Sequence, residues 1–409
     1  MDKIIILGAG PYQLHLIEQA KALGNYVITI TPEGDYPGIK VADKTYYHDA
    51  KDEEYALWVA QTENVNGIIS DQGDIFVRPV AYVAEKMGLP GNGYETAKLY
   101  TNKYRMRQRS KELGLATIES RLVRTLDEAK QAYRDLGGET IIKPVDASSS
   151  RGVYKVFSED ELIAHWDEAK ETSRSGDVIL EQFINGPQYE VDSIAVKGHV
   201  VPLMYADLKE FNIPNVFSSA TRLYPSVADD ETVRRLLEYS NKINEGFGMI
   251  QGISHNEYII DEKTGEIYLI ECALRGGGTF IASDIAYLST GIDTADFLVK
   301  VALGKLDDVP EFRMNRCHCG YAAFYMPSGE VLSTEGLEEV KALDYVVNMK
   351  MNGICVGKHL GAMEDKNQRH AIVLYADTRE ELLARIEHLK ELIKFRVKTD
   401  KGIEGPIWE

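Results

Sequence analysis

The sequence predicts a multidomain chain that joins an α/β domain to α+β domains. Three observations support this prediction. Residues 1–115 alternate short apolar segments with amphipathic ones, residues 253–272 have the pattern of an antiparallel hairpin, and residues 309–409 mix strand-like and helix-like segments. With 409 residues, 44% of them hydrophobic, the chain can bury large cores, and its length favours two to three domains.

The N-terminal region has the pattern of a Rossmann-like parallel sheet. Strands are predicted at Lys3–Leu7, Val27–Ile30 and Val65–Ser70, with helices at Tyr12–Leu23, Tyr55–Gln61 and Glu95–Leu115. Gly8-Ala9-Gly10 follows the first strand, but Gln13 stands where a dinucleotide fingerprint has its third glycine, so NAD is not expected. This turn stays a candidate for binding another ligand, together with Asp71–Asp74.

Charge and cysteine content narrow the class of protein. A net charge of −18 argues against non-specific binding to nucleic acid or to an anionic membrane. Four scattered cysteines are too few for a disulfide framework, and Cys317-His318-Cys319 lacks further metal ligands nearby in the sequence. No apolar run reaches membrane-spanning length, and the N-terminus leads directly into a strand. We therefore expect a cytoplasmic protein.

Residues 141–153 have the composition of a phosphate-binding loop. Ile141 and Ile142 predict the end of a strand, and Lys143 follows them with one positive charge. The residues from Ala147 to Gly152 are mostly small, which lets backbone N–H groups approach phosphate oxygens. The segment is not a Walker A motif, and taken alone it is equally typical of a polar surface hairpin.

A pair of carboxylates lies further along the chain. Glu257 is on a predicted strand over residues 253–260, and Glu271 is on the next strand, residues 266–272, across a tight turn. Antiparallel pairing can bring both side chains together, as a divalent cation with phosphate ligands requires. Arg275 follows, with a guanidinium suited to phosphate or carboxylate. The alternative is a pair of exposed hairpin acids and an arginine that caps a turn.

Other elements complete the expected order. Further strands are predicted at Val178–Phe183 and Ala371–Tyr375, with helices at 231–247 and Arg379–Phe395.

In order and spacing, these segments resemble the ATP-grasp superfamily of carboxylate–amine ligases, which includes biotin carboxylase, carbamoyl-phosphate synthetase and bacterial L-amino-acid ligases. The similar segments are Gly88–Gly91, Asn102-Lys103, Ile142–Pro144, Ala147–Val153, Glu181–Ile184 with Gly186, His255–Glu257, and Ile270-Glu271 with Arg275. The resemblance implies an ATP-grasp fold with a Rossmann-like domain (1–115), an ATP-grasp domain (116–308) that includes a small lid (118–190), and a mixed C-terminal domain (309–409).

The resemblance also implies roles for individual residues. Those expected to bind ATP are Lys103, Lys143, Ser148, Ser149, Ser150, Arg151, Gly152, Glu181, Phe183, Ile184, Gln188 and Glu190. Among them, Glu181 would accept a hydrogen bond from the adenine amino group, and the serine loop would close over the phosphates. Glu257 and Glu271 would hold Mg²⁺ or Mn²⁺, while Arg275 and Lys143 would stabilise the transition state.

Two positions depart from the family pattern. The family usually has asparagine, a further metal ligand, two residues after the second metal-binding acid, and this chain has Ala273. The ribose-facing position, often acidic, is Gln188, which can still hydrogen-bond a hydroxyl.

The expected function is ATP-dependent ligation of a small-molecule carboxylate to a small-molecule amine, with release of ADP and phosphate. Activation as an acyl-phosphate is needed because oxide is a poor leaving group, and such catalysis depends on positioning and charge stabilisation. We expect a homodimer that binds neither nucleic acid nor membrane. Two alternatives are a purine-pathway-type ligase or carboxylase that uses bicarbonate or formate, and a nucleotide-binding protein without catalysis, suggested by Ala273.

Overall fold

The N-terminal part of the chain forms a four-stranded parallel sheet in the order β3-β2-β1-β4. Its elements are β1 (Lys3–Leu7), α1 (Pro11–Ala22), β2 (Tyr26–Thr31), β3 (Lys44–Tyr47), α2 (Glu53–Glu63), β4 (Gly67–Ile69) and α3 (Val77–Met87). Ile4, Ile5 and Ile6 are all fully buried, as in a parallel sheet covered on both faces. The predicted Rossmann-like arrangement is confirmed. The computed structural model describes all residues except 149, 215, 362 and 364–368.

The single helix predicted over Glu95–Leu115 is wrong. The chain instead forms α4 (Tyr94–Leu99) and α5 (Lys103–Glu112). Asn102 separates them, because its side chain accepts a hydrogen bond from the backbone N–H of Arg105 (3.0 Å) and caps a new helix. Lys103 and Arg107, one turn apart at the start of α5, are both buried, and they contact Glu271 and Glu181, respectively.

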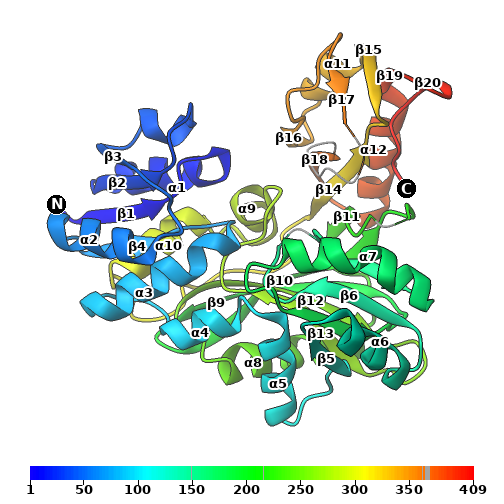
Figure 1. Cartoon of the computed structure of the whole chain (residues 1–409). Helices are drawn as coiled ribbons and strands as arrows, with labels where there is room; N and C mark the ends of the chain where they lie inside the picture. Colours follow the sequence, from blue (N-terminus) through cyan, green and yellow to red (C-terminus); the bar gives the residue numbers. More distant parts are fainter. Residues whose placement is uncertain (149, 215, 362, 364–368) are drawn as a thin grey trace.

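A small antiparallel sheet forms the region of the predicted lid. Its order is β5-β8-β6-β7, with β5 at Ser120–Val123, β8 at Val178–Gln182, β6 at Thr140–Pro144 and β7 at Tyr154–Val156. Helices α6 (Leu126–Asp135) and α7 (Glu159–Thr172) pack against it through a core that contains Ile142, Leu162 and Trp166. This unit lies beside the large sheet at the lower right of Figure 1.

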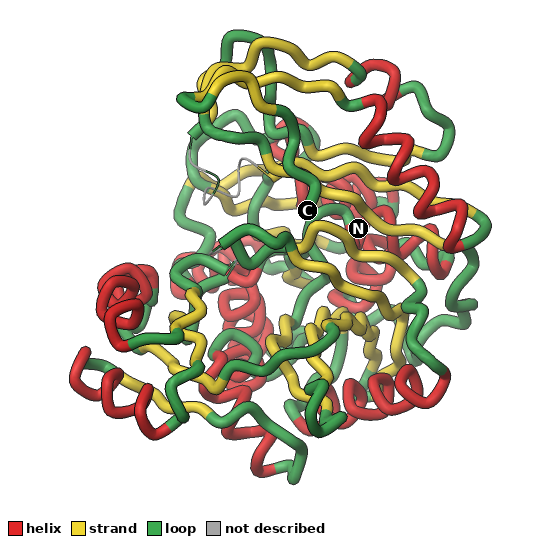
Figure 2. Tube along the Cα trace, turned by 90° about the vertical axis from the view of Figure 1, so that its right-hand side faces the viewer, coloured by secondary structure: helices red, strands yellow, loops and turns green. Residues whose placement is uncertain are grey.

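An eight-stranded sheet forms the largest part of the protein, in the order β13-β12-β9-β10-β11-β14-β18-β16. Its strands are β9 (Gln188–Val196), β10 (His199–Glu210), β11 (Ser219–Tyr224), β12 (Gly252–Ile260), β13 (Ile267–Ala273), β14 (His318–Tyr325), β16 (Val346–Lys350) and β18 (Arg369–Ala376). They come from both sides of the predicted domain limit at residue 309. Figure 2 shows long strands that cross the middle of the molecule.

The remaining elements surround this sheet. They are α8 (Asp230–Gly246), the π-helical turn η3 (Ile281–Ile285), α9 (Ala286–Thr290), α10 (Thr294–Ala302), β15 (Gly329–Glu335), α11 (Leu337–Lys341), β17 (His359–Leu360), α12 (Arg379–Leu392), β19 (Lys394–Thr399) and β20 (Gly402–Glu404), with 3₁₀ turns η1 (Pro37–Lys40) and η2 (Asp74–Phe76). Strands β17, β15, β19 and β20 form a fourth sheet.

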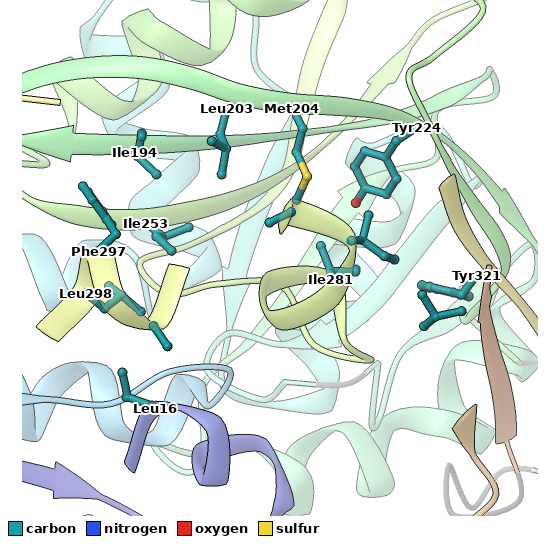
Figure 3. Packing of buried hydrophobic residues seen from close by; sticks show 14 of the residues in the cluster. Leu16, Ile194, Leu203, Met204, Tyr224, Ile253, Ile281, Phe297, Leu298 and Tyr321 are labelled. Atoms are coloured by element: carbon teal, nitrogen blue, oxygen red, sulfur yellow. The ribbon is translucent and has the colours of Figure 1, made fainter. Parts of the chain in front are cut away.

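One hydrophobic cluster connects the N-terminal sheet to the large sheet. It includes Leu16 from α1, Leu298 from α10, Ile281 from η3 and Met204 from β10 (Figure 3). Burial of a side chain of this size stabilises the folded state by about 1.5–3 kcal/mol. The cluster therefore holds the N-terminal sheet, and the loops at the ends of its strands, in a fixed position relative to the large sheet. Among the described helices, none is long and apolar enough to cross a membrane.

Candidate active site

Two cavities meet where the small sheet faces the large one. The first has a volume of about 240 Å³ and is lined by Lys103, Lys143, Glu181, Phe183 and Ile184 among others. The second, of about 520 Å³, extends toward the N-terminal loops and the C-terminal strands. The residues that line both are Ser150, Gln188, Glu210, Phe217, Glu257 and Glu271. A ligand that fills the first cavity therefore presents one end to the second.

Glu181 and Lys143, two buried charged residues, line the first cavity, and a third, Arg107, contacts Glu181. The carboxylate of Glu181 pairs with both cations: its Oε2 lies 2.5 Å from Lys143 Nζ, and its Oε1 lies 2.7 Å from Arg107 Nε. Burial alone would raise the pKa of Glu181, but Arg107 and Lys143 hold that pKa below its usual value. Burial lowers the pKa of Lys143, while Glu181 opposes that shift.

The role predicted for Glu181, accepting a hydrogen bond from an adenine amino group, stays a prediction, and Glu181 does line the first cavity. Both of its oxygens already contact internal cations, so Glu181 also holds Lys143 and Arg107 in place. Arg107 was not among the predicted site residues, because nothing in the sequence of α5 marks which of its basic side chains turns inward.

Glu257 and Glu271 face each other across β12 and β13, as the sequence predicted. The strand register pairs the two residues directly, and both line the two cavities at their junction. Each carboxylate has a cationic partner: Arg222 donates to Glu257, and Lys103 Nζ lies 2.7 Å from Glu271 Oε1. Burial would raise the pKa of Glu257, but Arg222 and His255 keep the pKa far below its usual value, so this group stays anionic.

This donor set fits a hard divalent cation. Two carboxylates on neighbouring strands provide the oxygens that Mg²⁺ prefers, and they lie where a triphosphate in the first cavity would end. Neighbouring lysines can neutralise the remaining phosphate charge.

Glu190 lies outside the cavities, which corrects its predicted role in nucleotide binding. It is fully buried in the centre of the large sheet, where Arg222 and Tyr224 donate to its carboxylate. The prediction placed Glu190 on the same strand face as Gln188, which does line both cavities. Next to Gln188 on that face, Glu190 is covered by Arg222 from β11. The local sequence gives no signal for such a contact between strands that are distant in the chain.

A buried network continues from Glu190 to Asp192 and His255. His255 Nδ1 lies 2.8 Å from Asp192 Oδ1, and burial raises the pKa of Asp192 to about 7 although His255 opposes this. Glu190, Asp192 and His255 are close enough together to hold a metal ion. However, the Arg222 guanidinium binds Glu190 and lies 3.0 Å from His255 Nε2, so it supplies the positive charge that a metal would bring.

Arg275 lines the second cavity and is tied to the N-terminal domain. Its Nε and Nη2 donate to the carboxylate of Asp74 at 2.9 and 3.3 Å. Asp74 belongs to the loop after β4 that the sequence marked as a ligand-binding candidate. Ala273, on the same face of β13 as Glu271, also lines this cavity.

The predicted loop residues are only partly brought together. Ser148, Ser150 and Arg151 line the second cavity, and Ser149 lies outside the described residues. Gly152 has a φ of +68° and packs closely against its neighbours, since a Cβ atom at this position would come within 3.1 Å of Pro144. Its role is therefore to shape the turn. Lys155 and Glu210 line the first cavity and were missed by the sequence analysis.

Comparisons with known proteins agree with this geometry. Residues 137–283 match an ATP-grasp domain, and residues 322–398 match L-amino acid ligase C-terminal domain 2. The alanine–anticapsin ligase of Bacillus subtilis is 25% identical over 362 residues, which cover 80% of this chain and 75% of that protein. The C-terminal section of the carbamoyl phosphate synthase large chain of Aquifex aeolicus is 24% identical over 348 residues, covering 80% and 63% of the two chains.

Solved structures support the same fold. An L-amino acid ligase from Bacillus licheniformis superposes with a TM-score of 0.83 at 21% identity, covering 98% of this chain and 99% of that one. Biotin carboxylase from Campylobacter jejuni gives a TM-score of 0.73 at 18% identity, with coverage of 100% and 93%. The predicted resemblance and fold are confirmed: the chain contains an ATP-grasp domain and a region that matches L-amino acid ligase C-terminal domain 2, and it is similar to ligases over most of its length.

Proposed function

We propose that this protein uses ATP to activate a small-molecule carboxylate as an acyl-phosphate and joins it to an amine, releasing ADP and phosphate. The observation that carries the proposal is the junction of the two cavities at Glu257 and Glu271. A nucleotide in the first cavity would direct its phosphates to this junction, and both organic substrates would enter from the second.

The residues of the chain have separate tasks in this reaction. Lys143 and Lys103 attract phosphate oxygens, while Glu181 and Glu271 hold their ammonium groups in place. Arg275, fixed by Asp74, presents its guanidinium to the second cavity, where charge develops on the carboxylate and the transferred phosphoryl group. Mg²⁺, when bound by Glu257 and Glu271, would neutralise phosphate charge and align the groups.

The C-terminal match to L-amino acid ligase domain 2 favours amide-bond formation over carboxylation. The second candidate, a ligase or carboxylase that uses bicarbonate or formate, is supported by the shared fold and by 24% identity over 315 residues to a formate-dependent phosphoribosylglycinamide formyltransferase, but no match of the C-terminal region favours it. The predicted domain limits, the homodimer, the cytoplasmic location and the use of Mn²⁺ in place of Mg²⁺ belong to the same proposal.

ADP release tests the proposal directly. Purified protein is mixed with ATP, Mg²⁺ and all pairs of the twenty amino acids, and in parallel with bicarbonate or formate plus amines. ADP formation that requires an amino acid and yields a new amide by mass spectrometry supports the ligase. Turnover only with bicarbonate or formate supports the second candidate. ATP binding without any turnover would favour a nucleotide-binding protein.

A further inference from the structure

Two basic residues of the C-terminal strands, Arg369 and Lys350, line the second cavity. Arg369 begins β18 and Lys350 ends β16, and these strands are adjacent at the edge of the large sheet. Neither residue belongs to the nucleotide cavity. Because Glu257 and Arg275 line the same second cavity, a molecule that extends from the reaction centre can contact both basic groups.

Arg369 is oriented by neutral groups. Its Nε and Nη2 donate to the carbonyl oxygen of Ser219 at 3.2 and 2.9 Å, and its Nη1 lies 3.4 Å from the hydroxyl of Thr279. The guanidinium lies over the ring of Tyr321, 5.0 Å from its centre. These contacts fix the side chain in a 9% exposed position, but none of them supplies a negative charge.

Lys350 is also without a carboxylate partner among the residues that the structure describes. Its Nζ lies 5.9 Å from the centre of the Tyr12 ring. Burial, with a smaller contribution from Arg369, lowers the pKa of Lys350 to about 8. The lysine is thus partly shielded from water and repelled by a second cation.

Four other cations around the reaction centre differ in this respect, because Lys103, Lys143, Arg222 and Arg275 each pair with a carboxylate. Of the two further described cations that line the cavities, Lys155 lies over the rings of Phe183 and Phe217, and Arg151 is exposed to solvent. In a protein with 64 acidic and 46 basic residues, two neighbouring cations without such a partner in the described chain indicate that the opposite charge comes from a ligand.

We propose that Arg369 and Lys350 form a subsite that binds the carboxylate of the amine substrate. The inference rests on the proposed ligase function, in which one substrate is activated beside Arg275 and the other must approach it through the same cavity. A guanidinium and an ammonium together match a carboxylate in charge and geometry. The amine substrate is therefore an amino acid, and the product retains a free carboxylate at this subsite.

The test separates this subsite from the activation step. An amino-acid pair that gives turnover in the ADP assay is used with wild-type protein and with Arg369→Gln, Lys350→Gln and the control Lys341→Gln. Lys341 is a surface residue paired with Glu338. Each variant is also assayed with hydroxylamine, a small amine without a carboxylate, which converts the activated substrate into a hydroxamate. Thermal melts confirm that each variant is folded.

We expect the KM of the amine amino acid to rise by tenfold or more in Arg369→Gln and Lys350→Gln, with hydroxamate formation unchanged. Wild-type protein should use the amino acid at least tenfold better than its amide, and Arg369→Lys should recover part of the loss. An equal loss of hydroxamate formation would overturn the inference, because the subsite would then serve the activated substrate. Equal use of acid and amide, unchanged KM values, or a preference for phosphoethanolamine over amino acids would also overturn it. Absence of ADP release with every amino-acid pair in wild-type protein would instead refute the proposed ligase.

Discussion

The ammonium group of Lys103 lies 2.7 Å from the carboxylate of Glu271, although 168 residues separate the two along the chain. The same ammonium donates to the carbonyl oxygen of Ala147 at 2.7 Å. One lysine thus joins α5, the predicted phosphate loop and the hairpin that carries the carboxylate pair. Such an ion pair can exchange partners, since phosphate can take the ammonium and a divalent cation the carboxylate.

Glu271→Gln should abolish ADP release while the protein remains folded. The amide keeps the size of the side chain but loses the charge that would hold Mg²⁺ against the phosphates. Turnover and its Mg²⁺ dependence are measured by ADP release, and folding by circular dichroism. Glu266→Gln is the control, because Glu266 lies on the exposed turn of the same hairpin. Near-normal turnover of Glu271→Gln at ordinary Mg²⁺ would assign the metal to other residues.

Lys143→Met should weaken ATP binding by about tenfold or more, since a charge-assisted contact contributes roughly 1.5–3 kcal/mol. It should also destabilise the protein, because Glu181 then keeps only Arg107 as its buried partner. The two effects are separated by Lys143→Met/Glu181→Gln, which should recover stability but not affinity. Calorimetry with a non-hydrolysable ATP analogue and thermal melts give the two readouts. Unchanged affinity would remove Lys143 from the nucleotide site.

The parts of the fold and site that the sequence predicted are those encoded locally. The all-apolar run at Ile4–Ile6 indicates a strand covered on both faces, and it is buried as expected. Glu257 and Glu271 could be paired because a short turn joins their strands. The break in the helix at Asn102 is also encoded locally, because the Asn102 side chain caps the new helix. The run of basic residues on both sides of Asn102 suggested one continuous helix instead.

Long-range pairing explains what the sequence did not predict. Arg222 donates to Glu257, which is 35 residues away in the sequence, and also to Glu190. Neither contact can be predicted from the residue pattern of the strands that form it. Lys350 and Arg369 come together only because β16 and β18 are neighbours in the large sheet. The order of these strands depends on the packing of the whole C-terminal part, which periodicity alone does not determine.

Arg222→Met should destabilise the protein by about 3–5 kcal/mol, because it leaves the fully buried Glu190 without its main cationic partner. Unfolding in urea measures this change. Arg222→Met/Glu190→Gln should recover most of it. The control Arg234→Met removes an exposed arginine from pairs with Glu231 and Glu238 and should change the stability much less, because solvent screens exposed ion pairs. A similar small effect for Arg222→Met would show that the network contributes little to folding.

Ala273→Asn tests whether the chain has compensated for the missing family asparagine. Ala273 is 3% exposed and pairs in register with His255, so its side chain lies on the face that also carries Glu271 and Glu257. His255 is held there by Asp192 and lies against Arg222. The positive charge of Arg222 on Glu257 already does part of what a second metal would do at that carboxylate.

We therefore expect Ala273→Asn to lose activity without using Mg²⁺ more tightly. An added amide next to His255 crowds a packed site, and such overpacking costs about 1–3 kcal/mol. ADP release is measured across an Mg²⁺ titration for wild type, Ala273→Asn and the smaller Ala273→Ser. The serine variant should lose less activity, because it adds one oxygen atom in place of an amide. A lower Mg²⁺ concentration for half-maximal rate in Ala273→Asn would mean that the site lacks a ligand at this position, and that Arg222 and His255 do not replace it.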